Sequence, residues 1–261
     1  MPAAPVTRRT FFTALAGAAV AARLAADETP FPECCRVRRL NVAGPAGWAG
    51  RRIVFLTDVH FGHHFGPPEA AALNTIVARE RPDAVLLGGD LGDERNTPMD
   101  GFFAHWSPGC ATVFAAGNHD TGYGGLSGVE RQAKAHGVTV LRNERESWNG
   151  LTIVGVPSAL CAPQRLDLVK GPGFKLLIGH EPDTWDWTYA SDFMQLAGHT
   201  HGGQVRFLGR PICLPTLGRL HPLGLYERAE NVRLLVSAGI GCTGPAVRVN
   251  CPPEIYRLDF T

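Results

Sequence analysis

Short, uninterrupted apolar runs alternate with amphipathic stretches through the first half of the chain. Each run contains no charged residue and is followed by glycine or polar residues, as is typical of strands buried on both faces of a sheet. The three runs are Ile53–Leu56, Ala84–Leu87 and Ala111–Ala116. Apolar residues recur at helical spacing in three further segments. Two of them separate the runs and the third follows the last run: Pro67–Arg79, Pro98–Trp106 and Leu126–His136. The pattern predicts β-α-β-α-β, the order of a layered α/β domain.

The second half of the chain is richer in predicted strands than in predicted helices. Six segments have strand character: Leu151–Val156, Phe174–Ile178, Phe193–Ala197, Gln204–Phe207, Arg233–Val236 and Glu254–Asp259. Earlier in the chain, Arg36–Val42 is expected to be an edge strand. Gly202–Gly224 contains three prolines and is expected to be a long irregular loop near the mouth of a site. Two sheets packed face to face, with helices outside, would account for both halves.

The overall composition is that of a globular protein with a sizeable core. The chain has 261 residues, of which 44% are hydrophobic and 19% are charged, and its formal net charge is +1. Such a balance gives no reason to expect a surface that binds nucleic acid or a polybasic surface that binds membranes. No change of composition indicates a second domain. We expect a linker and edge strand over residues 27–50 and one folded domain over residues 51–261.

Residues 1–26 have the features of an export signal. Arg8 and Arg9 are followed by Phe11 and Phe12 and by a run of small apolar residues that ends near Ala22. The run is shorter than the about 20 residues that span a bilayer, and a charged start before it is typical of a secretory signal. Adjacent arginines resemble a twin-arginine export signal. The expected partner is the twin-arginine export machinery, with delivery across the cytoplasmic membrane to the periplasm or cell surface. An uncleaved membrane anchor and a basic N-terminus of a cytosolic protein remain alternatives.

The seven cysteines contain no C-x-x-C pair, so a zinc knuckle is not expected. Outside the cytoplasm some of them could form disulfides, and buried free thiols are the other interpretation.

Polar motifs follow the predicted strands, and they contain side chains that bind metals. In order they are Asp58-Val59-His60, Gly89-Asp90-Leu91-Gly92-Asp93, Gly117-Asn118-His119-Asp120, Gly179-His180 and Gly198-His199-Thr200-His201. Strand ends of one sheet converge in space, so these ligands could close around a pair of ions. Mixed oxygen and nitrogen ligands admit Mn, Fe, Zn or Co, and two such ions about 3.5–4 Å apart can clamp a phosphoryl oxygen. Asp90, which follows a central strand and is flanked by glycines, is the candidate to bridge them.

The five motifs resemble those of the calcineurin-like metallophosphoesterase superfamily, over about Arg51 to Phe260. The run Gly198–Gln204 and the ending Val236–Gly241 with Pro253-Glu254-Ile255 resemble one branch, the bacterial exported or membrane-associated phosphoesterases. The resemblance implies a four-layer α-β-β-α sandwich that binds two divalent or trivalent metal ions. It implies one ion held by Asp58, His60, Asp90 and His201, and a second held by Asp90, Asn118, His180 and His199.

The same resemblance implies a mechanism. A hydroxide that bridges the two metals would attack phosphorus, and His119, oriented by Asp93, would protonate the leaving group. We therefore expect hydrolysis of phosphodiester or pyrophosphate bonds. His63, His64 and His221 could also reach the site.

Several substrate classes fit this resemblance. One alternative is a UDP-2,3-diacylglucosamine pyrophosphatase-like enzyme of lipid A synthesis, and another is a cyclic-nucleotide phosphodiesterase. Asp93 stands where purple acid phosphatases have tyrosine, and the Asp-Arg-Gly continuation of serine/threonine phosphatases is missing. The presence of all seven ligand candidates and His119 argues against a binding module without catalysis.

Overall fold

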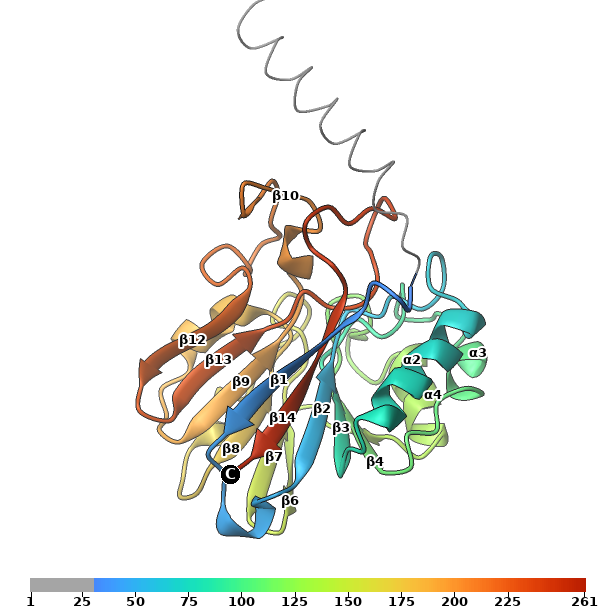
Figure 1. Ribbon diagram of the computed structural model, residues 1–261. Helices are drawn as coiled ribbons and strands as arrows, with labels where there is room; N and C mark the ends of the chain where they lie inside the picture. The colour runs from blue at the N-terminus through green and yellow to red at the C-terminus, as the bar shows by residue number, and fades with distance from the viewer. Residues whose placement is uncertain (1–30) are drawn as a thin grey trace, which may run out of the picture.

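Two six-stranded β-sheets pack face to face in the computed structural model, which describes residues 31–261 (Figure 1). The export signal predicted for residues 1–26 lies outside the described residues. Within residues 31–261, no helix is both long enough and apolar enough to cross a membrane.

The first sheet is mixed, with strand order β1-β14-β2-β3-β4-β5. Its strands are β1 (Arg36–Val42), β14 (Glu254–Phe260), β2 (Arg52–Leu56), β3 (Ala84–Leu87), β4 (Ala111–Phe114) and β5 (Thr139–Val140). Strands β2 to β5 run parallel to one another, whereas β14 is antiparallel to β2 and parallel to β1. The edge strand predicted over Arg36–Val42 is present and pairs with β14 along its whole length.

The second sheet has strand order β12-β13-β9-β8-β7-β6. Its strands are β12 (Gly224–Ala229), β13 (Val232–Val236), β9 (Phe193–Ala197), β8 (Lys175–Ile178), β7 (Leu151–Gly155) and β6 (Glu144–Trp148). The four central strands are parallel, and the outer two are antiparallel to their neighbours. Strands β10 (Arg206–Phe207) and β11 (Arg210–Pro211) form a separate hairpin. Parallel strands bring their C-terminal ends to a common edge, which is where the motifs begin.

Successive side chains of the buried strands point to opposite faces of the sheet and so contribute to two different hydrophobic cores. In β2, Ile53 and Phe55 belong to the core between the sheets, whereas Val54 and Leu56 pack toward the helices. The helices that cover this outer face are α2 (Pro67–Arg79), α3 (Asp100–Phe103) and α4 (Gly128–Ala135). This arrangement confirms the predicted α/β class, with sheets flanked by helices.

The outer face of the second sheet is covered by short 3₁₀ segments rather than by α-helices. They are η2 (Leu166–Val169) and η3 (Pro182–Trp187), and two further 3₁₀ turns are η1 (Ala46–Trp48) and η4 (His201–Gly203). Val169 and Trp185 pack there against Val154 and Phe193. The fourth layer of the predicted sandwich therefore consists of short 3₁₀ segments of four and six residues. Pro182 begins η3, which at six residues is longer than most 3₁₀ segments, because the poor hydrogen-bond geometry of this helix type keeps most of them short.

The predictions differ from the structure mainly where strands are exposed. Strands β6 and β12 are not predicted because each contains adjacent charged residues, as is common on edge strands, so they resemble loops in the sequence. The predicted irregular loop Gly202–Gly224 contains the β10–β11 hairpin. The helix predicted over Pro98–Trp106 was too long, since only Asp100–Phe103 is α-helical. By contrast, α2, β3 and β9 have the predicted bounds.

Candidate metal centre

The candidate ligands gather where the C-terminal edges of the two sheets meet. The first sheet supplies those that follow β2, β3 and β4, and the second sheet supplies those that follow β8 and β9. Two groups form there, each from side chains whose ligand atoms all lie within 4.8 Å of one another. Asp58, His60 and His201 make the first group, and Asp90, His180 and His199 make the second.

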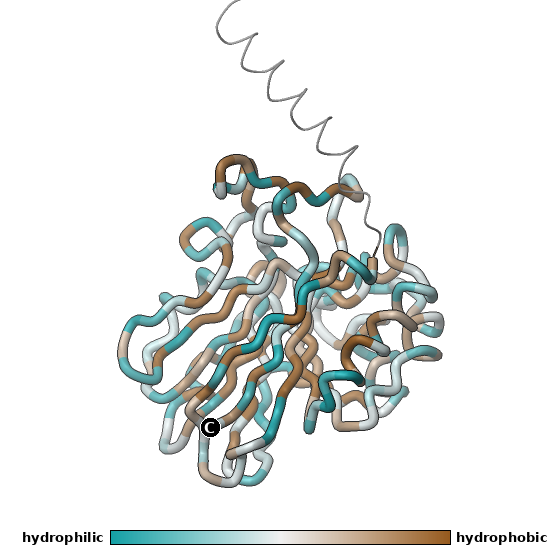
Figure 2. The backbone as a smooth tube through the Cα atoms, viewed as in Figure 1, coloured by the Kyte–Doolittle hydropathy of each residue, from teal (hydrophilic) through white to brown (hydrophobic). Residues whose placement is uncertain are grey.

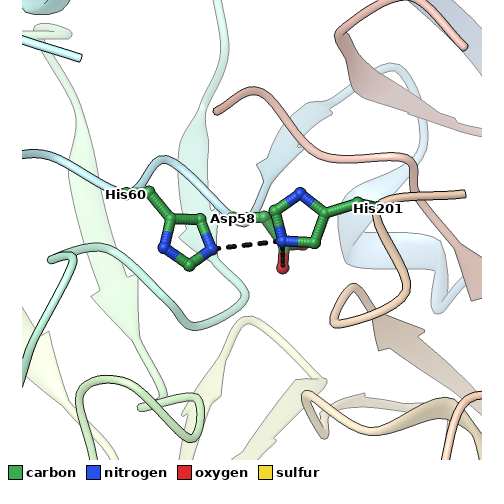
Figure 3. Close-up of side chains that lie close together, drawn as sticks. All are labelled: Asp58, His60 and His201. Atoms are coloured by element: carbon green, nitrogen blue, oxygen red, sulfur yellow. Dashed lines mark hydrogen bonds and ion pairs between the residues drawn. The ribbon is translucent and has the colours of Figure 1, made fainter. Parts of the chain in front are cut away.

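The first group directs two imidazole nitrogens at each other beside a carboxylate (Figure 3). His60 Nε2 lies 3.1 Å from His201 Nε2, and Asp58 Oδ1 lies 3.3 Å from His201 Nε2. All three side chains are buried. Two imidazole lone pairs repel each other at this distance unless a proton or a cation lies between them.

Backbone carbonyls fix the orientation of both imidazoles in the second group. His180 Nδ1 donates to Gly88 O at 2.8 Å, which leaves Nε2 facing Asp90 Oδ2 at 3.0 Å. His199 Nε2 donates to Thr216 O at 2.8 Å, so its Nδ1 is the nitrogen available to a ligand. Such contacts set which ring nitrogen can bind a metal.

Asp90 lies between the two groups. Its Oδ2 is 3.0 Å from His180 Nε2 and 3.8 Å from His60 Nε2. Its Oδ1 accepts a hydrogen bond from the backbone N–H of His119 at 2.9 Å, which holds the carboxylate in place. One carboxylate is therefore within reach of both groups.

Unpaired buried atoms indicate that this donor set fits metal ions. Within residues 31–261, the buried atoms Asn118 Oδ1 and His180 Nε2 have no hydrogen-bond partner. His180 Nε2 is close to Asp90 Oδ2 but is not aligned with it as a donor, as expected of two atoms that point at a common cation. A buried polar atom without a partner is costly. Carboxylate, amide and imidazole ligands together suit divalent metal ions.

The backbone is strained at five of the seven candidate ligands. Their φ angles are positive, a region that residues other than glycine seldom occupy: Asp58 (53°), His60 (51°), Asp90 (48°), His199 (68°) and His201 (50°). Strain of this kind costs about 1–3 kcal/mol per residue and is concentrated at functional sites. The strained backbone therefore directs these five side chains toward the candidate metal centre.

Two glycines of the motifs allow the strands to approach the carboxylates. A Cβ on Gly117 would overlap Asp90 Oδ1, and a Cβ on Gly198 would overlap Asp58 Oδ2. The glycine that begins each of these motifs is therefore required by the packing of the next strand end against a candidate ligand.

The charged groups of the centre shift one another's pKa values. Burial by itself disfavours a charged imidazole, but the carboxylates of Asp93, Asp90 and Asp58 raise the pKa of His60 above its ordinary value. Asp90 and Asp58 raise the pKa of His180 as well, again against the effect of burial. Burial would raise the pKa of Asp90, yet His180 and His60 hold it well below its usual range. The carboxylates thus attract positive charge, either protons or metal ions.

The other two histidines remain neutral. Burial lowers the pKa of His199, and the neighbouring His180 lowers it further. Burial also lowers the pKa of His201, to which His60 adds. Neutral imidazoles offer lone pairs to a metal without first losing a proton.

His119 lies beside the two groups and is held by the backbone of Asp93. Its Nδ1 donates to the Asp93 carbonyl oxygen at 2.7 Å, so Nε2 remains available. The Asp93 carboxylate has other neighbours: Oδ1 lies 3.3 Å from His60 Nδ1, and Oδ2 accepts from the backbone N–H of His63 at 3.2 Å. Asp93 therefore contacts both His119 and His60, but its side chain faces His60.

An open groove of about 490 Å³ runs along the His119 side of the centre. The Arg95 guanidinium lies over the Tyr123 ring at 5.2 Å from its centroid, and Tyr123 is 71% exposed. The lining is mostly polar: Asp93, Glu94, Arg95, Asn96, Asn118, His119, Thr121 and Tyr123. Space for a substituent of a substrate is thus available next to His119.

Asp120, the last residue of the Gly117–Asp120 motif, is buried and links two loops of the centre. Its carboxylate accepts hydrogen bonds from the backbone N–H groups of Leu91, Gly92 and Gly117, which joins the loops after β3 and β4. Burial and the nearby Asp90 raise its pKa to about 6. The position directly after His119 is the only signal in the sequence that points to it.

Arg248 supports the centre and was missed by the sequence analysis. Its Nη2 donates to Ala238 O at 2.8 Å and lies 3.5 Å from His201 Nδ1. No motif surrounds Arg248 in the sequence, so only the folded chain reveals this contact.

The other histidines considered for the site, His63, His64 and His221, make different contacts. The ring of His221 packs edge-on against Trp185 and Tyr226, and its Nδ1 lies 3.4 Å from Asp183 Oδ1. His63 and His64 are exposed.

Comparison with known proteins agrees with this geometry. Residues 51–210 match the family described as calcineurin-like phosphoesterase. The chain is 31% identical over 239 residues to an uncharacterised metallophosphoesterase of Campylobacter jejuni, covering 86% of this chain and 63% of that relative. This chain therefore spans less than two thirds of the Campylobacter protein.

Two further relatives are matched over most of their length. Metallophosphoesterase YkuE of Bacillus subtilis, also uncharacterised, is 26% identical, with 81% of this chain and 79% of the relative covered. Phosphodiesterase YaeI of Escherichia coli is 27% identical, with 80% and 82% covered. Since the matched family acts through the kind of Asp and His sites found here, the chain is a metal-dependent phosphoester hydrolase and belongs to the calcineurin-like phosphoesterase family.

Proposed function

We propose that the protein hydrolyses phosphodiester or pyrophosphate bonds and uses two metal ions to do so. The observation that carries this proposal is the position of Asp90, whose Oδ2 is within 3.8 Å of imidazole nitrogens from both ligand groups. A carboxylate shared in this way suits a pair of ions a few ångströms apart. Relatedness to a protein named as a phosphodiesterase supports the diester substrate.

The chain's own residues would divide the binding of the two ions. Asp58, His60, Asp90 and His201 would hold one, and Asp90, Asn118, His180 and His199 would hold the other. When bound, Mn, Fe, Zn or Co supplies a hydroxide nucleophile at neutral pH and withdraws charge from a phosphoryl group. The carbonyl oxygens of Gly88 and Thr216 keep His180 and His199 in the required orientation.

His119 would act as the general acid. Its Nδ1–H is held by the Asp93 carbonyl, so Nε2 is the atom that would carry a proton to the departing oxygen. The groove next to it would hold the leaving group, with Arg95 and Tyr123 at its rim.

Hydrolysis of two chromogenic esters tests the proposal. Protein stripped of metal would be given Mn, Fe, Zn or Co and assayed with bis-p-nitrophenyl phosphate and with p-nitrophenyl phosphate. We expect turnover that depends on metal and favours the diester. A preference for the monoester would contradict the diesterase assignment. Absence of turnover in protein shown to bind two ions would indicate a narrow substrate range, to be tested with nucleotide-linked pyrophosphates.

We also propose that the protein is exported through the twin-arginine route, as the adjacent Arg8 and Arg9 and the apolar run after them suggest. Replacing both arginines by lysine keeps the charge but removes the guanidinium groups. The variant is expected to accumulate in the cytoplasm in cell fractionation, while the unchanged chain is found outside it. Equal distribution of the two proteins would contradict the proposal.

A further inference from the structure

The segment after His201 forms an exposed apolar prominence. The β10–β11 hairpin projects from the body of the molecule, and its tip is among the hydrophobic parts of the backbone trace (Figures 1 and 2). Phe207 is 56% exposed and Leu208 is 86% exposed. In the chain that follows, Ile212 is 64% exposed and Leu220 is 67% exposed. We call residues 206–220 the docking segment. Large exposed apolar side chains at the hairpin tip and along the chain that follows it indicate an interaction site.

The docking segment is also positively charged, although the whole chain is nearly neutral. It contains Arg206, Arg210 and Arg219, and there is no aspartate or glutamate from Gly202 to Tyr226. None of these arginines takes part in an ion pair within residues 31–261. Arg210 and Arg219 are exposed, and their guanidinium groups complement an anionic surface.

Hydrogen bonds brace the docking segment. Arg206 donates from its backbone N–H to Val249 O at 2.9 Å and from Nη1 to Gly202 O at 2.9 Å. The Asp183 carboxylate accepts from the backbone N–H groups of Arg219 at 2.9 Å and of Leu220 at 3.2 Å. The apolar side chains are thus presented to solvent on a supported backbone.

The same stretch of chain reaches the metal centre. Thr216 O accepts the hydrogen bond from His199 Nε2 at 2.8 Å, and Leu217 O accepts from the backbone N–H of Asp183 at 3.0 Å. The docking segment is therefore connected directly to the metal centre through Thr216.

We propose that the docking segment binds the enzyme to an anionic lipid bilayer. The tip residues Phe207 and Leu208 would enter the boundary between headgroups and acyl chains, and the arginines would contact lipid phosphates. A rigid protein partner fits this shape less well. A narrow tip buries little area, whereas stable protein interfaces bury about 800 Å² per partner. Membrane binding by the docking segment does not depend on the proposed function. The role of this binding, which is to give the enzyme access to phosphate esters at a membrane surface, rests on the proposed function.

Vesicle co-sedimentation of the full chain tests the proposal. Vesicles of phosphatidylcholine would be compared with vesicles of phosphatidylcholine and phosphatidylglycerol in equal parts. The first variant is Phe207→Ser with Leu208→Ser, and the second is Arg210→Gln with Arg219→Gln. Tyr189→Ser is the matched control, because Tyr189 is 79% exposed but precedes β9, at the end of the sheet opposite the metal centre. Residues 1–30 are present in every protein, so their contribution cancels.

We expect the unchanged chain to prefer the vesicles with phosphatidylglycerol. Loss of the two arginines should weaken this binding by roughly fivefold per arginine, and loss of the apolar pair should weaken it by roughly tenfold or more. The Tyr189 control should bind like the unchanged chain. Substitutions that leave binding to phosphatidylglycerol unaltered, or a control that weakens it equally, would overturn the proposal.

Two further measurements separate the alternatives. Sedimentation equilibrium that shows a dimer of the unchanged chain and a monomer of the Phe207 and Leu208 variant would assign the segment to a second copy and overturn the membrane proposal. Hydrolysis of soluble bis-p-nitrophenyl phosphate should be equal in all variants. If the unchanged chain hydrolyses no ester, the proposed function fails, while the vesicle result still decides the docking proposal.

Discussion

Asp90 is the side chain on which the two ligand groups depend together. Replacing it with asparagine keeps the shape but removes the charge that the imidazoles of His60 and His180 face. We expect Asp90→Asn to lose bound metal and activity together, by more than the 10–100-fold typical of losing a residue that only supports a ligand. Metal content and turnover of bis-p-nitrophenyl phosphate measure the two effects. Full activity in this variant would rule out the shared-ligand assignment.

His119 is expected to behave differently, because it lies beside the ligands without being one of them. His119→Ala should retain metal and reduce turnover by roughly 10²–10⁴-fold, the usual contribution of a general acid. The loss should be smallest for p-nitrophenol, which leaves without needing a proton, and largest for an alkyl leaving group. Loss of metal from this variant would show instead that His119 is a ligand.

The raised pKa values of His60 and His180 make metal binding depend on pH. Below these pKa values each imidazole is protonated, so an incoming metal ion must displace the proton. Apparent metal affinity should therefore increase as pH rises through the raised values and then level off. Titration calorimetry in buffers of different ionisation enthalpy would detect the released protons. Affinity that does not change with pH would contradict this account.

Strand β2 shows how one element serves two layers and the site at the same time. Its alternating residues fill the core between the sheets and the core beneath the helices, and its end positions Asp58 and His60. Because both faces are buried, the strand has little freedom to shift. A shift of one residue would exchange the two faces and displace both candidate ligands.

Truncation of Phe55 tests this packing. Phe55 is fully buried between the sheets, and Phe55→Ala should lower the free energy of unfolding by about 3–5 kcal/mol. Phe207→Ala is the matched control, because Phe207 is 56% exposed and its loss should change stability by no more than about 0.5 kcal/mol. Urea denaturation followed by circular dichroism gives both values. Similar effects of the two substitutions would contradict the assigned core.

In the whole molecule, both sheets contribute to one centre, so metal binding should stabilise the complete domain. A ligand at 100 times its dissociation constant adds about 2.7 kcal/mol, which corresponds to a rise in Tm of roughly 5–10 °C for a domain of this size. Chelation should lower the unfolding midpoint, and added metal should restore it. The Asp90→Asn protein should show almost no such change. A large metal-dependent shift in that variant would place the stabilising ion elsewhere.

The sequence by itself determined the buried strands, their order of appearance and the side chains that follow them. These features are local: an apolar run without charges predicts a strand buried on both faces, and the motif at its end needs no knowledge of the remaining chain. The bounds of β3 and β9 follow from such patterns, whereas the grouping of Asp58, His60 and His201 was expected only from the resemblance to a known family.

Only the tertiary structure decided which strands are neighbours and which residues support the centre. Edge strands β6 and β12 are charged, so the sequence does not distinguish them from loops. Arg248 and the carbonyl oxygen of Thr216 contact candidate ligands 47 and 17 positions away in the chain. Such contacts depend on how the sheets pack, because backbone carbonyls carry no signature in the sequence and a lone arginine resembles any surface arginine.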